Sequence, residues 1–268
     1  MRFNYVRIGD ARELPLLSGS VDLIAFSPPY NVCKEYGGIH DSDRLDMSDY
    51  RKLLSRVAGE CWRVLRIGGR VCVNIANTGR NPYLALNAAV SLVFGREGLE
   101  LRGEIIWDKG ASVGTSTAWG SWCSPSNPCL RDVHEYILVF HKGSPRLTTP
   151  ITSTSAASCH TISAEDFTAW TKSIWRFPTE SAKRIGHPSP FPVELPRRLI
   201  ELYSYPGTVV LDPMCGSGTT LVAAKMLGRR WIGFDIVPEY VELAKERLDR
   251  VHDITERRPL PKRVRRRR

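Results

Sequence analysis

The sequence lacks the features of several large protein classes. Its seven cysteines are scattered and odd in number, and none forms a Cys-x-x-Cys pair. This pattern indicates neither a zinc site nor a disulfide framework, so we expect no metal and predict that most thiols are reduced core residues. No apolar run reaches the roughly 18 residues that a membrane helix needs, and the N-terminus has no signal-peptide pattern. We therefore expect a cytoplasmic protein that does not contact a membrane.

Acidic residues are missing from one end of the chain. The net charge is +10, and residues 257–268 carry eight Lys or Arg and no acid. Without these eight, 30 basic residues face 28 acidic ones, so the rest of the chain is nearly neutral. The pattern predicts a disordered basic arm suited to sequence-independent contact with a polyanion. The alternative is a solubilising tail that has no specific partner.

Internal repeats are also absent, and strand patterns alternate with helical ones. With 268 residues, the chain is long enough for one large α/β domain or two small ones. The alternation predicts a parallel sheet with helices on its faces. A helix is expected from Ser48, as N-cap, to a stop at Gly68-Gly69. The expected strands are residues 4–8, 21–26, 70–75, 101–107, 134–141, 208–211 and 230–235, and the other helices are 83–94, 192–203, 219–227 and one from 238.

The tetrapeptide Ser27-Pro28-Pro29-Tyr30 directly follows the apolar run of residues 21–26. Proline fixes φ and has no N–H donor, so two prolines make a stiff turn whose carbonyls are expected to be unpaired. In open α/β sheets, ligands bind at the carboxyl edge of the strands. A hydroxyl, free carbonyls and an aromatic ring at that edge suit the amino group of a nucleobase. The alternative is that the prolines merely end the strand and Tyr30 packs in the core.

A second motif follows the strand of residues 208–211 and runs from Asp212 to Thr220. Its glycines let backbone N–H groups approach a ligand, and Asp235, at the end of the next strand, is placed to hold ribose hydroxyls. The motif is neither Gly-x-Gly-x-x-Gly nor a phosphate-binding loop with lysine. Asp212 would repel a pyrophosphate but attract an ammonium group. A ligand with an adenosine end and an amino-acid end fits both acids, which favours S-adenosylmethionine.

In this order along the chain, the two motifs resemble those of the β-class amino-group DNA methyltransferases of the Ser-Pro-Pro-Tyr type. The resemblance implies a Rossmann-like fold with a mixed seven-stranded sheet, helices on both faces and a small target-recognition insertion. It also implies a set of site residues. These are Ser27, Pro28, Pro29 and Tyr30 for catalysis, and Asp10, His187, Asp212, Pro213, Cys215, Gly216, Gly218, Thr219 and Asp235 for cofactor binding.

The resemblance divides the chain into a catalytic half at residues 1–143 and a cofactor-binding half of the same domain at 176–254. The stretch 144–175 falls where the family keeps its target-recognition region, and 255–268 is the basic tail. Loops 31–47 and 109–132 are expected to contribute to recognition. Duplex DNA is the implied partner, while a cognate restriction endonuclease and the choice between monomer and homodimer stay open. Trp119, Trp122 and Trp170 either stack on bases or anchor their loops.

The activity implied is site-specific methyl transfer from S-adenosylmethionine to N4 of a flipped cytosine. Tyr30 would stack on the base, while the Ser27 hydroxyl and the Pro28 carbonyl accept the amino hydrogens. Serine at the first motif position is associated with cytosine N4, although adenine N6 is an alternative. The weaker alternatives are a non-catalytic DNA-binding subunit and a methyltransferase for RNA or a small molecule. Cys129 follows a proline as in cytosine-C5 enzymes but lacks the partner motifs, so we expect no nucleophilic role.

Overall fold

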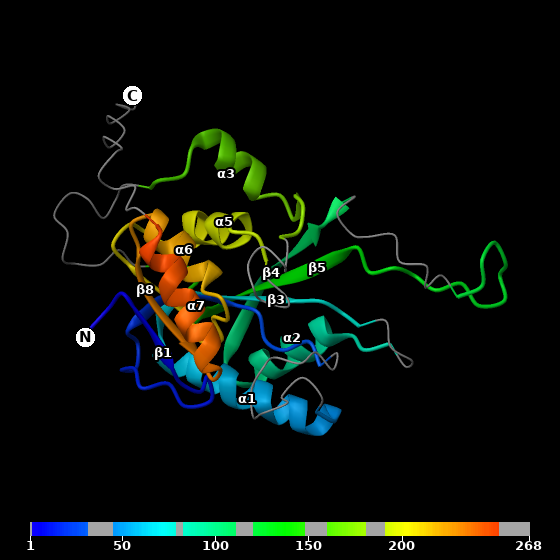
Figure 1. Ribbon diagram of the computed structural model, residues 1–268, viewed down its shortest axis with the longest axis horizontal. Helices are drawn as coiled ribbons and strands as arrows, with labels where there is room; N and C mark the ends of the chain where they lie inside the picture. The colour runs from blue at the N-terminus through cyan, green and yellow to red at the C-terminus, as the bar shows by residue number, and fades with distance from the viewer. Residues whose placement is uncertain are drawn as a thin grey trace.

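The computed structural model describes residues 2–31, 45–78, 83–110, 120–147, 160–180 and 191–251. They form an eight-stranded sheet covered by helices on both faces (Figure 1). The strands are β1 (Tyr5–Ile8), β2 (Val21–Phe26), β3 (Leu65–Ile75), β4 (Leu99–Asp108), β5 (His134–Lys142), β6 (Ile174–Arg176), β7 (Val209–Asp212) and β8 (Arg230–Asp235). The helices are α1 (Met47–Val64), α2 (Leu86–Arg96), α3 (Ala164–Trp170), α5 (Glu194–Tyr203), α6 (Thr219–Met226) and α7 (Pro238–Asp249).

The strand order is β1-β8-β7-β2-β3-β5-β4-β6. Among the described strands, β5 alone runs against its neighbours, pairing antiparallel with both β3 and β4. The mixed sheet is therefore confirmed, but the expected number of seven strands is wrong. The additional strand β6 lies at the edge and pairs in parallel with β4, with Trp107 opposite Trp175. Its three residues are too few to show a period-2 pattern, so it could not be predicted from periodicity.

Strand β2 is the centre of the fold, between β7 and β3. All six of its residues are buried, including Asp22. The Asp22 carboxylate accepts a hydrogen bond from the Val209 N–H at 2.7 Å and pairs with Arg66 at 2.7 Å. These contacts fix the start of β7 against β2. The segments that follow β2 and β7, which contain the two motifs, therefore emerge side by side at the carboxyl edge.

Helix α1 begins and ends earlier than expected. Asp46, not Ser48, is its N-cap, and its side chain accepts hydrogen bonds from the Ser48 and Asp49 N–H groups at 2.8 and 2.9 Å. The helix ends at Val64, and β3 begins at the next residue. Gly68 therefore lies within β3, where its φ is +79° and a Cβ would lie 2.1 Å from the Arg146 carbonyl oxygen. The glycine is needed for this close backbone approach, not to stop the helix.

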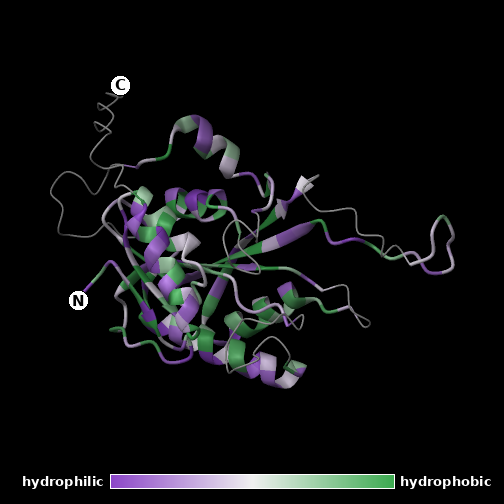
Figure 2. Ribbon diagram, in the orientation of Figure 1, coloured by the Kyte–Doolittle hydropathy of each residue, from purple (hydrophilic) through white to green (hydrophobic). Residues whose placement is uncertain are grey.

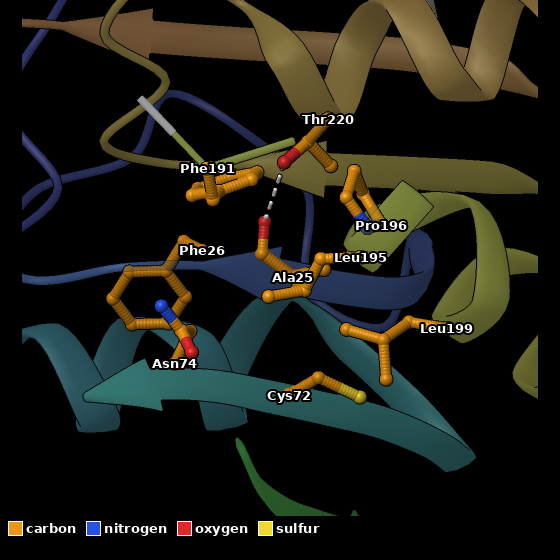
Figure 3. A pocket seen from close by; sticks show the side chains of 9 residues that line it. All are labelled: Ala25, Phe26, Cys72, Asn74, Phe191, Leu195, Pro196, Leu199 and Thr220. Carbon is orange, nitrogen blue, oxygen red and sulfur yellow. Dashed lines mark hydrogen bonds between the residues drawn. The ribbon is translucent and has the colours of Figure 1, made fainter. Parts of the chain in front are cut away.

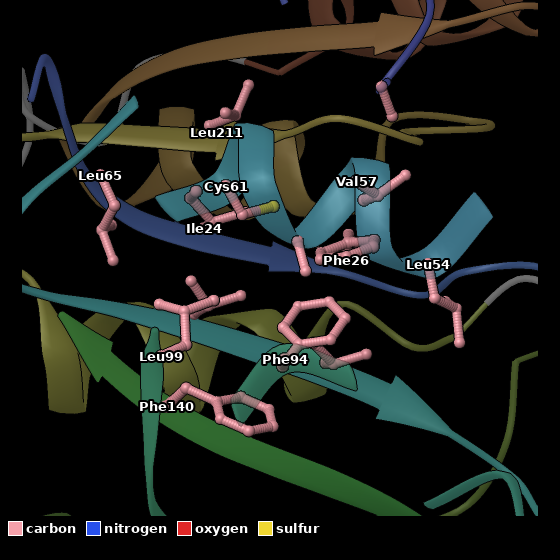
Figure 4. Packing of buried hydrophobic residues seen from close by; sticks show 14 of the residues in the cluster. Ile24, Phe26, Leu54, Val57, Cys61, Leu65, Phe94, Leu99, Phe140 and Leu211 are labelled. Atoms are coloured by element: carbon pink, nitrogen blue, oxygen red, sulfur yellow. The ribbon is translucent and has the colours of Figure 1, made fainter. Parts of the chain in front are cut away.

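Two apolar layers hold the helices on the sheet (Figure 2). Helices α1 and α2 cover one face, where Ile24 and Phe26 of β2 contact side chains of α1 and α2 (Figure 4). Phe94 of α2 stacks on Phe140 of β5 with ring centroids 5.2 Å apart. Helices α3, α5 and α6 pack on the opposite face, and α7 packs on α6 and β8. Both faces of β2 are thus buried, which explains its unbroken apolar sequence.

The stretch 144–175, expected to be the target-recognition region, contains α3 and the first two residues of β6. Ser163 caps α3, and Trp170 at its end is only 5% exposed. The Arg198 guanidinium of α5 lies over the rings of Trp170 and Trp175, at 5.4 and 5.3 Å from their centroids. Trp170 therefore anchors its segment to the core. Trp122, by contrast, is 70% exposed, and Trp119 lies outside the described residues.

Candidate active site

The catalytic tetrapeptide forms a connected hydrogen-bond network with residues of two other strands. The Ser27 Oγ lies 2.9 Å from Tyr30 Oη and 2.9 Å from the Asn74 carbonyl oxygen, and donates its single proton to one or the other of these acceptors. Tyr30 Oη donates to Glu135 Oε2 at 2.9 Å. The Asn74 Nδ2 donates to Tyr30 Oη at 2.8 Å and to Glu135 Oε2 at 2.6 Å. Ser27 and Tyr30 are half-buried, so the network reaches the surface at these two residues.

Lys109, Glu135 and Asn74 were missed as site residues in the sequence. Lys109 Nζ contacts Glu135 Oε1 at 2.6 Å, completing the network. Because β5 is reversed, its first residues lie at the same edge as the last residues of β2, β3 and β4. The sequence feature that could have identified Glu135 is its place as an acid near the start of the run 134–141. In a strand parallel to its neighbours, however, this acid would lie at the opposite edge of the sheet from the tetrapeptide.

Helix α1 contacts the proline turn of the tetrapeptide. The Tyr50 Oη donates to the Pro29 carbonyl oxygen at 2.7 Å, so the expectation that both proline carbonyls are unpaired is wrong for Pro29. No donor among the described residues reaches the Pro28 carbonyl. Asn31, with φ +54°, is 3% exposed and exchanges two 2.8 Å hydrogen bonds with the Leu45 backbone. These contacts make the turn rigid.

The cofactor motif follows β7 beside the tetrapeptide. Asp212 is fully buried, and burial raises its pKa to about 7 although the Thr220 hydroxyl and the Met214 N–H favour the charged form. Burial also raises the pKa of Asp235, whose carboxylate accepts from the Gly216 and Val237 N–H groups at 2.7 and 3.0 Å. A buried acid and a half-buried one near the same loop fit a cationic ligand, because a positive charge lowers the cost of ionising them.

The glycines of the motif have the backbone conformations that the loop requires. Gly218 has φ +75° and is the N-cap of α6, and a Cβ there would lie 2.8 Å from the Ala244 Cβ of α7. Gly216 has φ +47°. Pro213, Cys215 and Thr219 are buried beneath the loop, and burial raises the pKa of the Cys215 thiol. Their role in cofactor binding stays a prediction.

Asp10 lies near the end of β8, while one further predicted residue cannot be placed. Strand β1 pairs with β8, and the Gly9 N–H donates to the Asp235 carbonyl oxygen at 3.0 Å. The Asp10 carboxylate accepts a hydrogen bond from the Arg12 Nε at 2.9 Å, and this contact lowers the pKa of Asp10. His187 lies outside the described residues.

A small cavity lies between the sheet and helices α5 and α6, and its lining includes Phe26, which precedes the tetrapeptide, and Thr220 of the cofactor motif (Figure 3). It is bounded by the ends of β2 and β3 and by the first turns of α5. The Thr220 hydroxyl crosses toward β2 and donates to the Ala25 carbonyl oxygen at 3.4 Å. The lining residues are Ala25, Phe26, Cys72, Asn74, Phe191, Leu195, Pro196, Leu199 and Thr220. The wall is mostly apolar, and the Asn74 side chain brings an amide to it.

The comparisons with known proteins agree with this geometry. The model of a family described as DNA methylase, which groups N6 and N4 methyltransferases, matches residues 21–246. The chain belongs to the N6/N4 DNA methylase family. The Type II methyltransferase M.MjaI of Methanocaldococcus jannaschii is 30% identical, covering 90% of this chain and 89% of the relative. The DNA adenine methyltransferase YhdJ of Escherichia coli is 28% identical, covering 90% and 80%.

Solved structures place a cofactor in this fold. TTHA0409 of Thermus thermophilus, in complex with S-adenosyl-L-methionine, matches with a TM-score of 0.72 and 31% identity, covering 92% of this chain and 93% of that one. The PvuII cytosine-N4 methyltransferase matches with a TM-score of 0.69 and 20% identity, covering 93% and 88%, which supports the fold alone. The methylase therefore acts on DNA and uses S-adenosylmethionine. Within the described residues, no helix is long and apolar enough to cross a membrane, and no metal-binding cluster occurs.

Arg247 of α7 fixes the cofactor loop of the methylase from behind. Its Nη1 donates to the Ser217 carbonyl oxygen at 2.6 Å, to Ser217 Oγ at 2.8 Å and to Thr219 Oγ1 at 3.0 Å. Replacing Arg247 with alanine is expected to weaken S-adenosylmethionine binding about tenfold, because one charged donor to several acceptors contributes roughly 1.5–3 kcal/mol. Isothermal titration calorimetry measures the affinity.

The matched control is Arg250→Ala, one helical turn along α7. Arg250 pairs with Glu246 at the surface and does not contact the loop. An Arg247→Ala protein that folds and binds the cofactor as tightly as Arg250→Ala would show that the loop does not need this support.

Proposed function

We propose that the methylase transfers a methyl group to the exocyclic N4 of cytosine in duplex DNA. The observation that carries this proposal is the Ser27 hydroxyl at the carboxyl end of β2, hydrogen-bonded on its inner side to Tyr30 and Asn74. A short neutral hydroxyl in this place offers lone pairs to an incoming amino group. The resemblance also supports this target, because serine at the first motif position is associated with cytosine-N4 methylation.

The base must leave the helix to reach Ser27, at a cost of roughly a few kcal/mol. The Ser27 hydroxyl and the Pro28 carbonyl would then accept the two amino hydrogens, which directs the nitrogen lone pair. The Tyr30 ring, fixed through its hydroxyl by Glu135, would stack on the base. S-adenosylmethionine would supply a sulfonium methyl group as the electrophile and leave as S-adenosylhomocysteine, and the methylated nitrogen would then release one proton to water. The protein contributes positioning and stabilises charge on the nitrogen, without a covalent enzyme intermediate.

We assign cofactor binding to the residues predicted from the motif. Asp235 would hold the ribose hydroxyls, since its carboxylate is oriented by two backbone N–H groups. Asp212 would attract the ammonium group of the methionine part. Asp10 lies near Asp235 and is assigned to the adenosine end. Residues 144–175 are proposed as the target-recognition region, with α3 and β6 as its folded base. A restriction endonuclease partner is proposed because several relatives are named Type II methyltransferases.

Adenine N6 is the second candidate target. YhdJ, a relative that spans most of this chain, is named a DNA adenine methyltransferase. Both reactions place an exocyclic amine against acceptors at the end of β2, so the same network serves either base. The two differ in the size of the base that the pocket must admit.

Nucleoside mass spectrometry of DNA from cells expressing the methylase decides between these targets. N4-methylcytosine is expected, and it should be absent from cells expressing the Ser27→Ala variant at the same level. N6-methyladenine in its place would show that Ser27 does not determine the base. No new methylated base from a folded, cofactor-binding protein would contradict the proposed activity. Sequencing of the methylated DNA then gives the recognition site.

A further inference from the structure

Glu135 fixes the direction of the polar groups that contact Ser27. Its side chain is buried at the start of β5, and one of its oxygens, Oε1, contacts the Lys109 ammonium at 2.6 Å. The other oxygen, Oε2, accepts from Tyr30 Oη at 2.9 Å and from Asn74 Nδ2 at 2.6 Å. An ionised carboxylate can only accept hydrogen bonds. Both neighbours must therefore point their protons at it.

This constraint passes from Tyr30 to Ser27. Because the single proton of Tyr30 is given to Glu135, its oxygen can only accept from other groups. Ser27 Oγ, 2.9 Å away, directs its own proton inward, to Tyr30 Oη or to the Asn74 carbonyl oxygen. In both arrangements the outer side of the Ser27 hydroxyl carries lone pairs alone. A serine that is free to rotate would offer a donor and an acceptor equally.

The Glu135 carboxylate also determines the orientation of the Asn74 side-chain amide. Its NH₂ group faces Glu135 and Tyr30, so the reversed amide would put two acceptors together. The Asn74 Oδ1 is thereby left buried without a hydrogen-bond partner among the described residues, and Asn74 lines the cavity between the sheet and α5 (Figure 3). Unpaired buried acceptors are costly and point to a group that donates to them.

We propose that Glu135 is a specificity-determining positioning residue, which makes the base pocket accept an exocyclic amino group and reject a carbonyl. The inference rests on the proposed function but holds for either target base. Cytosine and adenine present N–H donors where uracil and hypoxanthine present an oxygen. An oxygen there would face the lone pairs of Ser27, and turning the Ser27 proton outward to meet it would cost the hydrogen bond to Tyr30 or Asn74.

The test measures binding and requires no methyl transfer. Duplexes contain the recognition site found by sequencing, with the target base placed opposite an abasic site so that unpairing costs nothing in either duplex. One duplex carries cytosine and the other uracil, or adenine and hypoxanthine if adenine is the target. Fluorescence anisotropy, with S-adenosylhomocysteine present, gives the two dissociation constants. The wild-type protein is expected to prefer the amino base by about tenfold or more, since a site built for a donor rejects an analogue that lacks it.

Glu135→Gln is expected to reduce this ratio to below about threefold, because an amide can donate as well as accept and frees Tyr30 and Ser27 to turn. Glu104→Gln, an exposed position on β4, is the control and should keep the wild-type ratio. Tyr30→Phe removes the hydroxyl that links Glu135 to Ser27 by hydrogen bonds, so it should also lower the ratio of dissociation constants. This variant keeps the test valid if the Glu135 variant does not fold. A purely structural role would weaken both duplexes equally. An unchanged ratio in folded Glu135→Gln and Tyr30→Phe would overturn the proposal, whereas failure of the proposed function appears earlier, as absence of methylation by the wild-type protein.

Discussion

Ser27→Ala is expected to slow methyl transfer at least 100-fold in a single turnover while leaving the affinity for S-adenosylmethionine unchanged. The hydroxyl is proposed to accept an amino hydrogen whose bond strengthens as the nitrogen becomes positive, and removing one such contact costs roughly 2.7–4 kcal/mol in comparable sites. Its hydroxyl is hydrogen-bonded to Tyr30 and Asn74 and not to a residue of the cofactor motif. Rapid-quench measurement of methyl incorporation gives the rate, and calorimetry gives the affinity.

Ser20→Ala is the matched control for this experiment. Ser20 precedes the same strand at its other end, and its hydroxyl donates to the Leu17 carbonyl oxygen in a surface turn. We expect it to behave as the wild-type protein in both measurements. A Ser27→Ala protein with the turnover rate of Ser20→Ala would show that the acceptor role is wrong.

Asp212→Asn is expected to abolish tight cofactor binding and, at the same time, to stabilise the cofactor-free protein at alkaline pH. Burial raises the pKa of Asp212 to about 7, from 3.8 for an exposed aspartate. The folded protein thus binds this proton more tightly than the unfolded chain, so stability falls as the pH rises between these two values. At pH 8 the ionised side chain costs about 4 kcal/mol, converted at 1.36 kcal/mol per unit. An asparagine keeps the shape without the charge.

Urea unfolding at about pH 5 and pH 8 tests the stability effect, with no cofactor present. The wild-type protein should lose stability between the two, and Asp212→Asn should lose much less. The affinity for the cofactor should depend on pH in the opposite direction to the stability. An ammonium group favours the ionised Asp212, so the affinity should decrease as the pH falls below about 7. Wild-type cofactor affinity that is constant from about pH 6 to pH 8 would show that no ionisation accompanies binding.

The sequence predicted the two motifs and their order because each depends on local chemistry at the end of one strand. The proline turn after residue 26 and the glycines at 216 and 218 are visible without any tertiary information. The partners of Ser27 were not predictable in this way. Asn74 and Glu135 come from β3 and β5, and they meet the tetrapeptide only because β5 is reversed. Strand direction depends on pairing across the sheet, which no short window of sequence contains.

The aromatic residues of α3 and β6 show a second limit. A tryptophan in a polar stretch such as 160–175 has the same sequence context whether it is exposed or buried. Trp170 and Trp175 are buried because they pack in the apolar layer between the sheet and α5, where Arg198 also lies over both rings. Most of these neighbours come from elements distant along the chain, so the local sequence does not show them.

The pair of hydrogen bonds between Asn31 and Leu45 affects how a different target sequence could evolve in such an enzyme. Because the Asn31 side chain exchanges two hydrogen bonds with the Leu45 backbone, the two residues that flank the segment 32–44 are held together at one fixed point. Residues within that segment can be replaced, or their number altered, while both attachment points keep their positions. Asn31 directly follows Tyr30, so evolution can vary this segment beside the catalytic tetrapeptide without moving the groups that hold the base.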